Sequence, residues 1–346
     1  MIKILLGISN DLNALNNEIF WIPQQEINPH LIMSGTSGSG KTETLKVICH
    51  ELAKQQIPLL IFDFHNDFGR FAKNIIDENS IRMHPLEILE GQKPKYVAHK
   101  VSAILKNSFK DLTTIQEGVI RKAICLFYRN SGITDLTKPN DGTYKLKPFW
   151  EFKRYFSMVS AEKRTVESIE IKLDILFDYE VFSQSDSASI DFDSLLKSNT
   201  VLQLKSAPSD EVKRIVSELI ISKLIQHSYI YEQTKEIRLY CVLDEAHRMV
   251  YPGSPIETLF RESRKYGIGV ILASQRASDF SENLLANAGT VITLKCNMIK
   301  DAKFIAKNNF GKEERLMNAS VGEGCIRFGR LNYFEDIKII PLNERK

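Results

Sequence analysis

The stretch GTSGSGKT, Gly35 to Thr42, restricts the possible folds of this chain more than any other part of the sequence. It matches G-x-x-x-x-G-K-[ST] and lies between an apolar run, Leu31 to Met33, and an amphipathic segment, so it is expected to join a strand to a helix. In that setting the glycines let backbone N–H groups turn inward. These donors and the positive end of the helix form a cradle for phosphate oxygens. A flexible Gly/Ser loop, the alternative, would not explain the flanking patterns.

The pattern also predicts individual roles at a nucleotide site. Lys41 supplies positive charge for the β and γ phosphates, and the Thr42 hydroxyl is placed to bind the Mg²⁺ that accompanies a nucleotide. The residues expected to surround the nucleotide are Gly35, Thr36, Ser37, Gly38, Ser39, Gly40, Lys41, Thr42 and Glu43.

The composition is that of a soluble globular protein, with 346 residues of which 43% are hydrophobic and 26% charged. Lysine and arginine number 46 against 43 acidic residues, so any contact with nucleic acid must come from a local surface or from a ring of subunits. The five cysteines include no C-x-x-C pair, which favours small buried thiols in a reducing compartment. No run approaches a membrane span, and the apolar residues 2–8 are too few for a signal peptide. A cytoplasmic protein without membrane insertion is expected.

Apolar runs that alternate with helical segments predict a three-layer α/β domain with a mostly parallel sheet. The strands expected after the phosphate loop cover residues 59–62, 200–204, 237–243, 268–273 and 290–294. Residues 2–8 and 18–22 are expected to form a small N-terminal β-hairpin within residues 1–28. A helix is expected to begin after Ser254, because Pro255 and Glu257 complete the pattern of a capping box.

Residues 96–199 differ from this pattern, because apolar side chains recur there with the helical period of 3.6. They predict an all-helical insertion that divides the α/β core into residues 1–95 and 200–346. Within it, residues 144–155 interleave aromatic and basic side chains. That pattern fits a stacking surface for nucleic acid, but an ordinary helix with its aromatic residues inward is the favoured interpretation.

A second group of polar residues completes a hydrolytic site. Asp244 follows the apolar run 239–243, where an acidic side chain can hold Mg²⁺ through water, and Glu245 is placed to orient the attacking water. Acidic pairs after strands also cap helices, but the phosphate loop in the same chain favours the catalytic interpretation. Gln275 ends the run ILASQ and is expected to sense the γ-phosphate or the water.

Arg261, Arg264 and Lys265 lie on the helix before that strand, too far along the chain from the phosphate loop to be assumed part of the same site. An arginine that reaches the γ-phosphate of a neighbouring subunit raises turnover by about 10³ to 10⁵, so a ring of subunits would explain them. A solvated basic face is the alternative.

Residues 244–247 spell DEAH, a helicase motif. Only about 100 residues follow, too few for the second lobe that such helicases need, and no Ser-Ala-Thr step is present. His247 is therefore expected to be a structural residue or one at the edge of the site.

Together these phrases resemble the HerA/FtsK superfamily of hexameric DNA-pumping ATPases, and its HerA branch in particular. The stretches that carry the resemblance are Pro29-His30 ahead of LIMSGTSGSGKT, DFHNDF at 63–68, VLDEAH at 242–247, ESRKYGIGVILASQRASD at 262–279, and Gly322 to Ile326. The resemblance implies a RecA-like P-loop NTPase core with ATP and Mg²⁺ as cofactors, in a hexameric ring around double-stranded DNA. It also implies that Lys41 and Thr42 act at the nucleotide, Asp244 and Glu245 at metal and water, Gln275 as sensor, and Arg264, or else Arg261, as the trans-acting finger.

The chain departs from the family pattern in the region before the phosphate loop. About 30 residues precede the loop, where HerA proteins usually carry a β-barrel that docks a partner nuclease, so the barrel is expected to be missing or reduced to the hairpin. Asn66 and Ala277 also stand where the family often has Gly and Pro. The expected function is that of an ATP-driven DNA translocase with a nuclease or other effector partner. Two alternatives stay open: an ATP-binding ring scaffold that assembles an effector, as in antiviral defence, and a motor of the conjugation or packaging type.

Overall fold

The chain forms two compact units. The computed structural model describes residues 1–9, 18–77, 81, 83–137, 145–179, 181–182, 190–308, 310–331 and 333–345. The first unit comprises Met1–Ile75, Asp193–Gln203 and Gln233–Lys346, and the second comprises Ile76–Phe192 and Leu204–Glu232. The helical unit thus takes in residues 76–95 and 204–232, which the sequence analysis assigned to the core.

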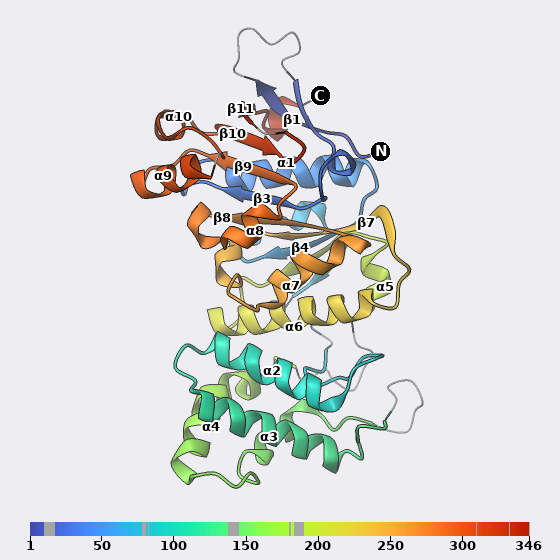
Figure 1. Ribbon diagram of the computed structural model, residues 1–346. Coiled ribbons are helices and arrows are strands. Elements are labelled where there is room, and N and C mark those ends of the chain that lie inside the picture. Colours follow the sequence, from blue (N-terminus) through green and yellow to red (C-terminus); the bar gives the residue numbers. More distant parts are fainter. Residues whose placement is uncertain are drawn as a thin grey trace. The chain divides into compact units, whose positions relative to one another are not determined.

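The first unit is built on one sheet, in which the described strands follow the order β2-β1-β11-β10-β9-β3-β8-β7-β4-β6-β5 (Figure 1). Strands β9, β3, β8, β7, β4 and β6 run parallel to one another, whereas β10 pairs antiparallel with β9, and β11, β1 and β2 extend the sheet further in antiparallel pairs. The bounds are Ile4–Ser9 (β1), Glu18–Trp21 (β2), Leu31–Ser34 (β3), Leu59–Asp63 (β4), Asn74–Ile76 (β5), Thr200–Gln203 (β6), Thr234–Leu243 (β7), Tyr266–Ser274 (β8), Thr290–Leu294 (β9), Glu323–Phe328 (β10) and Phe334–Ile339 (β11). The expected α/β class and the N-terminal hairpin are confirmed.

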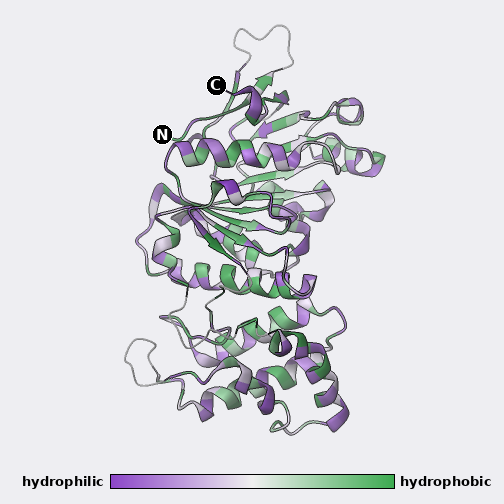
Figure 2. Cartoon of the chain, turned by 180° about the vertical axis from the view of Figure 1, so that it is seen from behind, coloured by the Kyte–Doolittle hydropathy of each residue, from purple (hydrophilic) through white to green (hydrophobic). Residues whose placement is uncertain are grey.

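Helix α1, Lys41–Lys54, packs against this sheet. Its buried Leu45, Ile48 and Leu52 belong to the same apolar cluster as Ile61 of β4 and Ile292 of β9. Strands β3 and β4 are buried at every residue, which explains their uninterrupted apolar sequences and the hydrophobic colour of the central strands in Figure 2. The other helices with residues in this unit are α5 (Phe192–Leu195), α7 (Pro255–Glu262), α8 (Glu282–Ala286), α9 (Ile299–Lys307) and α10 (Glu313–Asn318).

Helix α7 begins where the sequence indicated, but its capping box is only half formed. The Ser254 hydroxyl accepts a hydrogen bond from the Glu257 N–H at 3.3 Å, as an N-cap should. The Glu257 carboxylate accepts instead from the Gly253 N–H at 3.0 Å. The second hydrogen bond of a capping box, from the N-cap N–H to the Glu257 carboxylate, is therefore replaced by one from the N–H of Gly253, the residue before the N-cap.

The strand order brings three strand ends to one edge of the sheet. Strand β8 lies between β3 and β7, parallel to both, with Ser34 opposite Ser274 and Leu243 opposite Leu272. The chain leaves these three strands into the phosphate loop, the acidic pair and Gln275, respectively. Loops at the carboxyl ends of parallel strands form the usual ligand site of such sheets.

The second unit is helical, with α2 (Pro94–Ser108), α3 (Thr114–Asn130), α4 (Lys163–Asp178) and α6 (Asp210–Ser228). A complete capping box starts α3, since Thr113 and Gln116 each accept a hydrogen bond from the other's backbone. Residues Phe149–Tyr155 form a 3-10 helix, in which Phe149, Phe152 and Tyr155 are buried.

The rings of Phe149, Phe152 and Tyr155 therefore pack in the core of the helical unit. This agrees with the favoured interpretation from the sequence and removes these rings from any stacking surface. Among the aromatic residues of this helix, only Trp150 is largely exposed, with 64% of its surface accessible. Tyr144 lies outside the described residues. In the described ranges, none of the helices combines the length and the apolarity that crossing a bilayer requires.

Candidate nucleotide-binding site

The phosphate loop adopts a backbone that requires glycine at two of its positions. Gly38 and Gly40 have φ of 76° and 100°, in the left-handed region that other residues rarely adopt. Gly40 is also the N-cap of α1, so the loop leads directly into the positive end of that helix. A Cβ atom on Gly35 would come within 2.6 Å of the Ser39 Oγ and 2.9 Å of the Leu294 Cβ, which leaves no room for a side chain there.

Two segments from the end of the chain hold the loop in place. The Thr36 N–H donates to the Lys295 carbonyl at 2.9 Å, directly after β9. The Gly322 N–H donates to the Ser39 carbonyl at 2.9 Å, and a Cβ on Gly40 would lie 3.2 Å from the Gly322 nitrogen. No pattern in the sequence assigns this role to Gly322; its only signal is that it is a glycine, which its φ of 78° requires.

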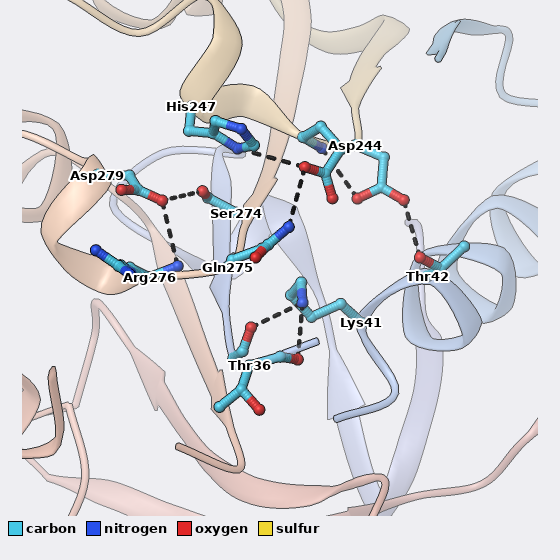
Figure 3. Close-up of polar contacts among 11 residues, drawn as sticks. Thr36, Lys41, Thr42, Asp244, His247, Ser274, Gln275, Arg276 and Asp279 are labelled. Atoms are coloured by element: carbon cyan, nitrogen blue, oxygen red, sulfur yellow. Dashed lines mark hydrogen bonds and ion pairs between the residues drawn. The ribbon is translucent and has the colours of Figure 1, made fainter. Parts of the chain in front are cut away.

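Lys41 lies inside the curl of the loop (Figure 3). Its Nζ donates to the Gly35 carbonyl at 2.7 Å and to the Thr36 carbonyl at 3.0 Å. Burial lowers the pKa of Lys41, while the nearby carboxylates of Asp244 and Glu245 act in the opposite direction. The cation is thus held by carbonyl oxygens that a phosphate can replace, since both kinds of oxygen accept N–H bonds.

Thr42 and Asp244 join the phosphate loop to the end of β7. The Thr42 hydroxyl donates to the Asp244 Oδ2 at 2.9 Å. Burial raises the pKa of Asp244, and the hydrogen bond from Thr42 partly offsets this effect. Because the hydroxyl uses its proton on Asp244, its lone pairs remain available for a metal ion, and the carboxylate orients that ligand from behind.

These residues fit a magnesium ion that is completed by other ligands. Mg²⁺ is usually held by one or two protein oxygens, with nucleotide phosphates and water filling the other positions. Among the described residues, no group of three or more His, Cys, Asp or Glu side chains could hold a metal ion by itself. The pair Thr42 and Asp244 therefore provides a protein contribution of the size that Mg²⁺ needs beside a nucleotide.

Glu245 and Gln275 meet at the same edge. Glu245 has φ 59° and ψ 40°, a left-handed conformation that is uncommon for a residue other than glycine. The Gln275 Nε2 donates to the Glu245 Oε2 at 3.4 Å, and the His247 Nδ1 lies 3.4 Å from the same oxygen. His247 thus lies at the edge of the site beside Glu245. Figure 3 shows Gln275 and His247 in the same part of the site as Lys41.

The turn after Gln275 is fixed by a residue that the sequence analysis did not single out. Asp279 accepts hydrogen bonds from the Ser274 hydroxyl and, at 3.2 Å, from the Arg276 N–H. These bonds bridge Gln275 on both sides and set the direction in which it leaves β8. A signal was present, because an aspartate five residues after a serine can close a short turn, but it is too common to be assigned from sequence.

Two other residues of the sequence motifs accept hydrogen bonds from backbone N–H groups. Glu43, included among the expected nucleotide contacts, accepts a hydrogen bond from the Leu342 N–H at 3.4 Å. Asp63, which opens DFHNDF, is buried and accepts from the N–H groups of Asp67 and Phe68 at 3.0 and 2.9 Å. Asn66 lies in that turn with φ 63°, a conformation that glycine and asparagine share, which explains how it replaces the family's Gly.

Arg264 is not brought to the phosphate loop of its own chain. It lies just before β8, whereas the loop and Gln275 lie beyond the other end of that strand, about 30 Å away for nine residues. There it lines a hollow of about 920 Å³ together with Lys265. Its guanidinium also lies near the buried His30 and helps to lower the pKa of that residue to about 3. Arg261 is exposed and pairs with Glu262 at 3.2 Å.

Comparison with known proteins identifies relatives of the chain. Residues 23–224, more than half of the sequence, match the family described as "Helicase HerA, central domain". The DNA double-strand break repair helicase HerA of Sulfurisphaera tokodaii is 24% identical over 308 residues, which are 83% of this chain and 59% of that protein. The DNA import protein CedB of Sulfolobus acidocaldarius is 26% identical over 284 residues, 76% of this chain and 43% of CedB. The chain thus spans less than two thirds of the length of these relatives.

Solved structures share the fold. VirB4 of Thermoanaerobacter pseudethanolicus superposes with a TM-score of 0.81 and 20% identity, covering 99% of this chain and 98% of VirB4. The bacterial conjugative coupling protein TrwB superposes with a TM-score of 0.63 and 13% identity, covering 92% of this chain and 85% of TrwB. Identities this low establish the RecA-like fold alone. The family follows from the match over residues 23–224: this chain belongs to the helicase HerA central-domain family and is a P-loop ATPase of the HerA/FtsK type.

Proposed function

We propose that this chain is the motor subunit of a hexameric ring that uses ATP hydrolysis to move along double-stranded DNA. The hydrogen bond between Thr42 and Asp244 carries the proposal, because it joins the phosphate loop to the acidic strand end that hydrolytic P-loop enzymes use. The names of two relatives, a DNA double-strand break repair helicase and a DNA import protein, support DNA as the substrate.

Nucleotide binding in this proposal uses the cradle as it stands. The inward N–H groups of the loop and the N-terminus of α1 bind the phosphates, and Lys41 exchanges its two carbonyl partners for phosphate oxygens. Thr42 would hold Mg²⁺ through its hydroxyl, oriented by Asp244; the ion when bound neutralises charge on the β and γ phosphates. TrwB has been solved with ADP and Mg²⁺, which supports the use of both.

Hydrolysis would depend on Glu245 and Gln275. The Glu245 carboxylate is placed to orient and polarise a water molecule. Its two neighbours, Gln275 and His247, each lie at 3.4 Å, a long distance at which water can compete for the carboxylate. Gln275 is then free to turn toward the γ-phosphate, so that one side chain responds both to the nucleotide and to the catalytic carboxylate.

A ring of subunits would supply the arginine that the nucleotide site of a single chain does not receive from Arg264. Arg264 lies at the opposite edge of the sheet from the phosphate loop, so its own site has no arginine from this position. In a ring, the edge that carries Arg264 in one subunit would face the phosphate loop of the next. Contacts with the DNA would come from loops that face the pore and grip phosphates without reading sequence. A nuclease or another effector is the partner expected for such a motor.

The first test is steady-state ATP hydrolysis over a range of protein concentrations, with and without linear duplex DNA. Turnover per subunit is expected to rise with protein concentration, as rings assemble, and to rise again with DNA. Turnover that is independent of concentration would contradict the ring. Turnover indifferent to duplex DNA would contradict DNA as the substrate.

Two site variants separate binding from hydrolysis. Lys41→Ala is expected to abolish nucleotide binding or turnover, whereas Glu245→Gln is expected to bind ATP and lower turnover by about 10² to 10⁴. Glu282→Gln, the same change at an exposed position of α8, is the matched control and should behave as the unaltered chain. Normal turnover in Glu245→Gln would remove the assignment of Glu245 as the residue that activates water.

A second candidate is a motor for DNA transfer, favoured by the 26% identity to the DNA import protein CedB. Recovery of the native protein in a membrane-bound complex would support it.

If Glu245→Gln still supports an effector in cells, ATP binding is sufficient for function. That result would favour a ring scaffold over both motors.

A further inference from the structure

Basic residues are concentrated in the hairpin formed by α2 and α3. Residues 94–130 contain seven lysines and arginines against two acidic residues, a net charge of +5, whereas the whole chain carries +3. The rest of the chain is therefore slightly acidic. A local positive field of this kind attracts negatively charged partners to one place on the molecule.

A hollow of about 580 Å³ opens among these residues, entirely within the second unit. We refer to it as the α3 hollow. Its apolar lining comes from Cys125 and Leu126 of α3 and from Met158 and Val159, and its charged lining from Lys95, Arg121, Lys122 and Arg129, with Ser160 beside them. The volume lies in the range of ligand pockets, and the combination is that of an apolar floor with a cationic rim.

Most of the rim charge is available for a partner. Lys95 pairs with Asp135 at 3.1 Å. Arg121, Lys122 and Arg129 are exposed and make no ion pair or hydrogen bond within the part of the chain that the structure describes. Such a surface is best completed by carboxylates or phosphates from another molecule.

The apolar floor of the α3 hollow indicates which kind of anionic partner fits it. Single-stranded nucleic acid is held by aromatic rings on which bases stack, and among the described residues no aromatic side chain lines the hollow. A duplex backbone offers phosphates and sugars, which would leave Leu126 and Met158 without an apolar partner. A peptide supplies both kinds of group, because an aliphatic side chain fills the floor while neighbouring aspartates or glutamates meet the rim.

We infer that the α3 hollow docks an acidic peptide segment of a partner protein, with one aliphatic side chain on the floor and carboxylates at the rim. The inference does not depend on the proposed motor function, since the hollow contains none of the residues assigned to nucleotide. Attraction between exposed charges would speed the encounter and would weaken as salt rises.

Selection from a random twelve-residue phage-displayed peptide library against the full chain tests this directly. The enriched peptides are expected to carry an aliphatic residue flanked by aspartate or glutamate. Their affinity is expected to fall by about tenfold or more in Arg121→Glu/Lys122→Glu, where like charges now face each other. The control is Lys163→Glu/Arg164→Glu, the same charge change at an exposed pair on α4 outside the hollow, which should retain binding. Absence of enrichment, or peptides without acidic residues, would overturn the inference.

A second readout locates the peptide. Cys125 is the half-buried cysteine of the five, and the others are at most 4% exposed, so labelling with a maleimide at alkaline pH reports on the hollow. A bound peptide should protect Cys125, and Met158→Glu, which places a carboxylate on the floor at a half-exposed position, should abolish both binding and protection. Peptide binding that leaves Cys125 unprotected would place the site elsewhere. Protection by a twenty-base-pair duplex that competes with the peptide would show nucleic acid to be the ligand instead.

Discussion

Replacing His30 by glutamine tests whether one buried imidazole makes the first unit sensitive to acid. His30 is 2% exposed, its Nδ1 accepts from the Val270 N–H at 3.1 Å, and its ring lies 4.5 Å from that of Phe260. Burial, reinforced by the charge of Arg264, lowers the pKa of His30 from 6.5 to about 3. The folded chain therefore keeps the ring neutral where the unfolded chain takes up a proton.

The magnitude follows from proton linkage. Because the folded pKa is depressed, the contribution of the neutral ring to stability is fully present above pH 6.5 and is lost as the pH falls toward 3. Each pH unit within this window costs about 1.4 kcal/mol of unfolding free energy. At pH 5 the loss through His30 alone is about 2 kcal/mol relative to pH 8.

Urea unfolding monitored by tryptophan fluorescence between pH 5 and pH 8 measures this, since Trp21 is buried in the same unit. His30→Gln is expected to be less stable at pH 8, but its unfolding free energy should fall by about 2 kcal/mol less on going to pH 5. His65→Gln, the same change at an exposed position, should keep the original pH dependence. Parallel curves for His30→Gln and the unaltered chain would refute the reasoning.

Three further substitutions, the last with Arg261→Ala as its comparison, test the nucleotide site. Gly40→Ala should cost about 1 to 3 kcal/mol of stability and weaken binding of a fluorescent ATP analogue, because φ is 100° and the new Cβ would lie 3.2 Å from the Gly322 nitrogen; unchanged binding and melting would contradict the strained loop. Gln275→Ala should keep nucleotide affinity but lower turnover by about 10² to 10³, and an unaltered rate would remove the sensor role. Arg264→Ala should lower turnover by about 10³ or more, whereas Arg261→Ala should have little effect. Mixing Arg264→Ala subunits with Lys41→Ala subunits should restore part of the turnover, because the second kind of subunit still supplies Arg264 to its neighbour. If Arg261→Ala lowers turnover more than Arg264→Ala, the two assignments are exchanged.

The sequence predicted which residues meet at the candidate nucleotide site, because that edge of the sheet depends on short-range patterns and on one rule of sheet geometry. Glycines, lysine and threonine at fixed spacing indicate the loop, and Asp244 lies beside Thr42 because parallel strands end at the same edge. Gln275 follows from the same rule. Thr42 and Asp244 are far apart in the sequence, but the order of the strands in the sheet brings them together.

Other features depended on pairings that a single sequence does not display. The antiparallel extension by β10, β11, β1 and β2 brings together segments from both ends of the chain, and the contact of Gly322 with Ser39 depends on it. The hydrogen bond that the Glu43 carboxylate accepts from the Leu342 N–H likewise joins segments far apart in the sequence. The rings of Phe149 and Phe152 could face inward or outward by their spacing, and only the packing of the helical unit decides that they are buried.

The support of the phosphate loop by Lys295 and Gly322 has a consequence for biosynthesis. The loop is translated before the carbonyl and the amide that hold it, and β1 is translated before β11, on which it pairs. A nascent chain on the ribosome therefore lacks a shaped cradle, and pairing over such sequence separations is slow to form. We therefore expect ATP to bind only after these later strands have docked, so that nucleotide binding would report that the sheet of the first unit has formed.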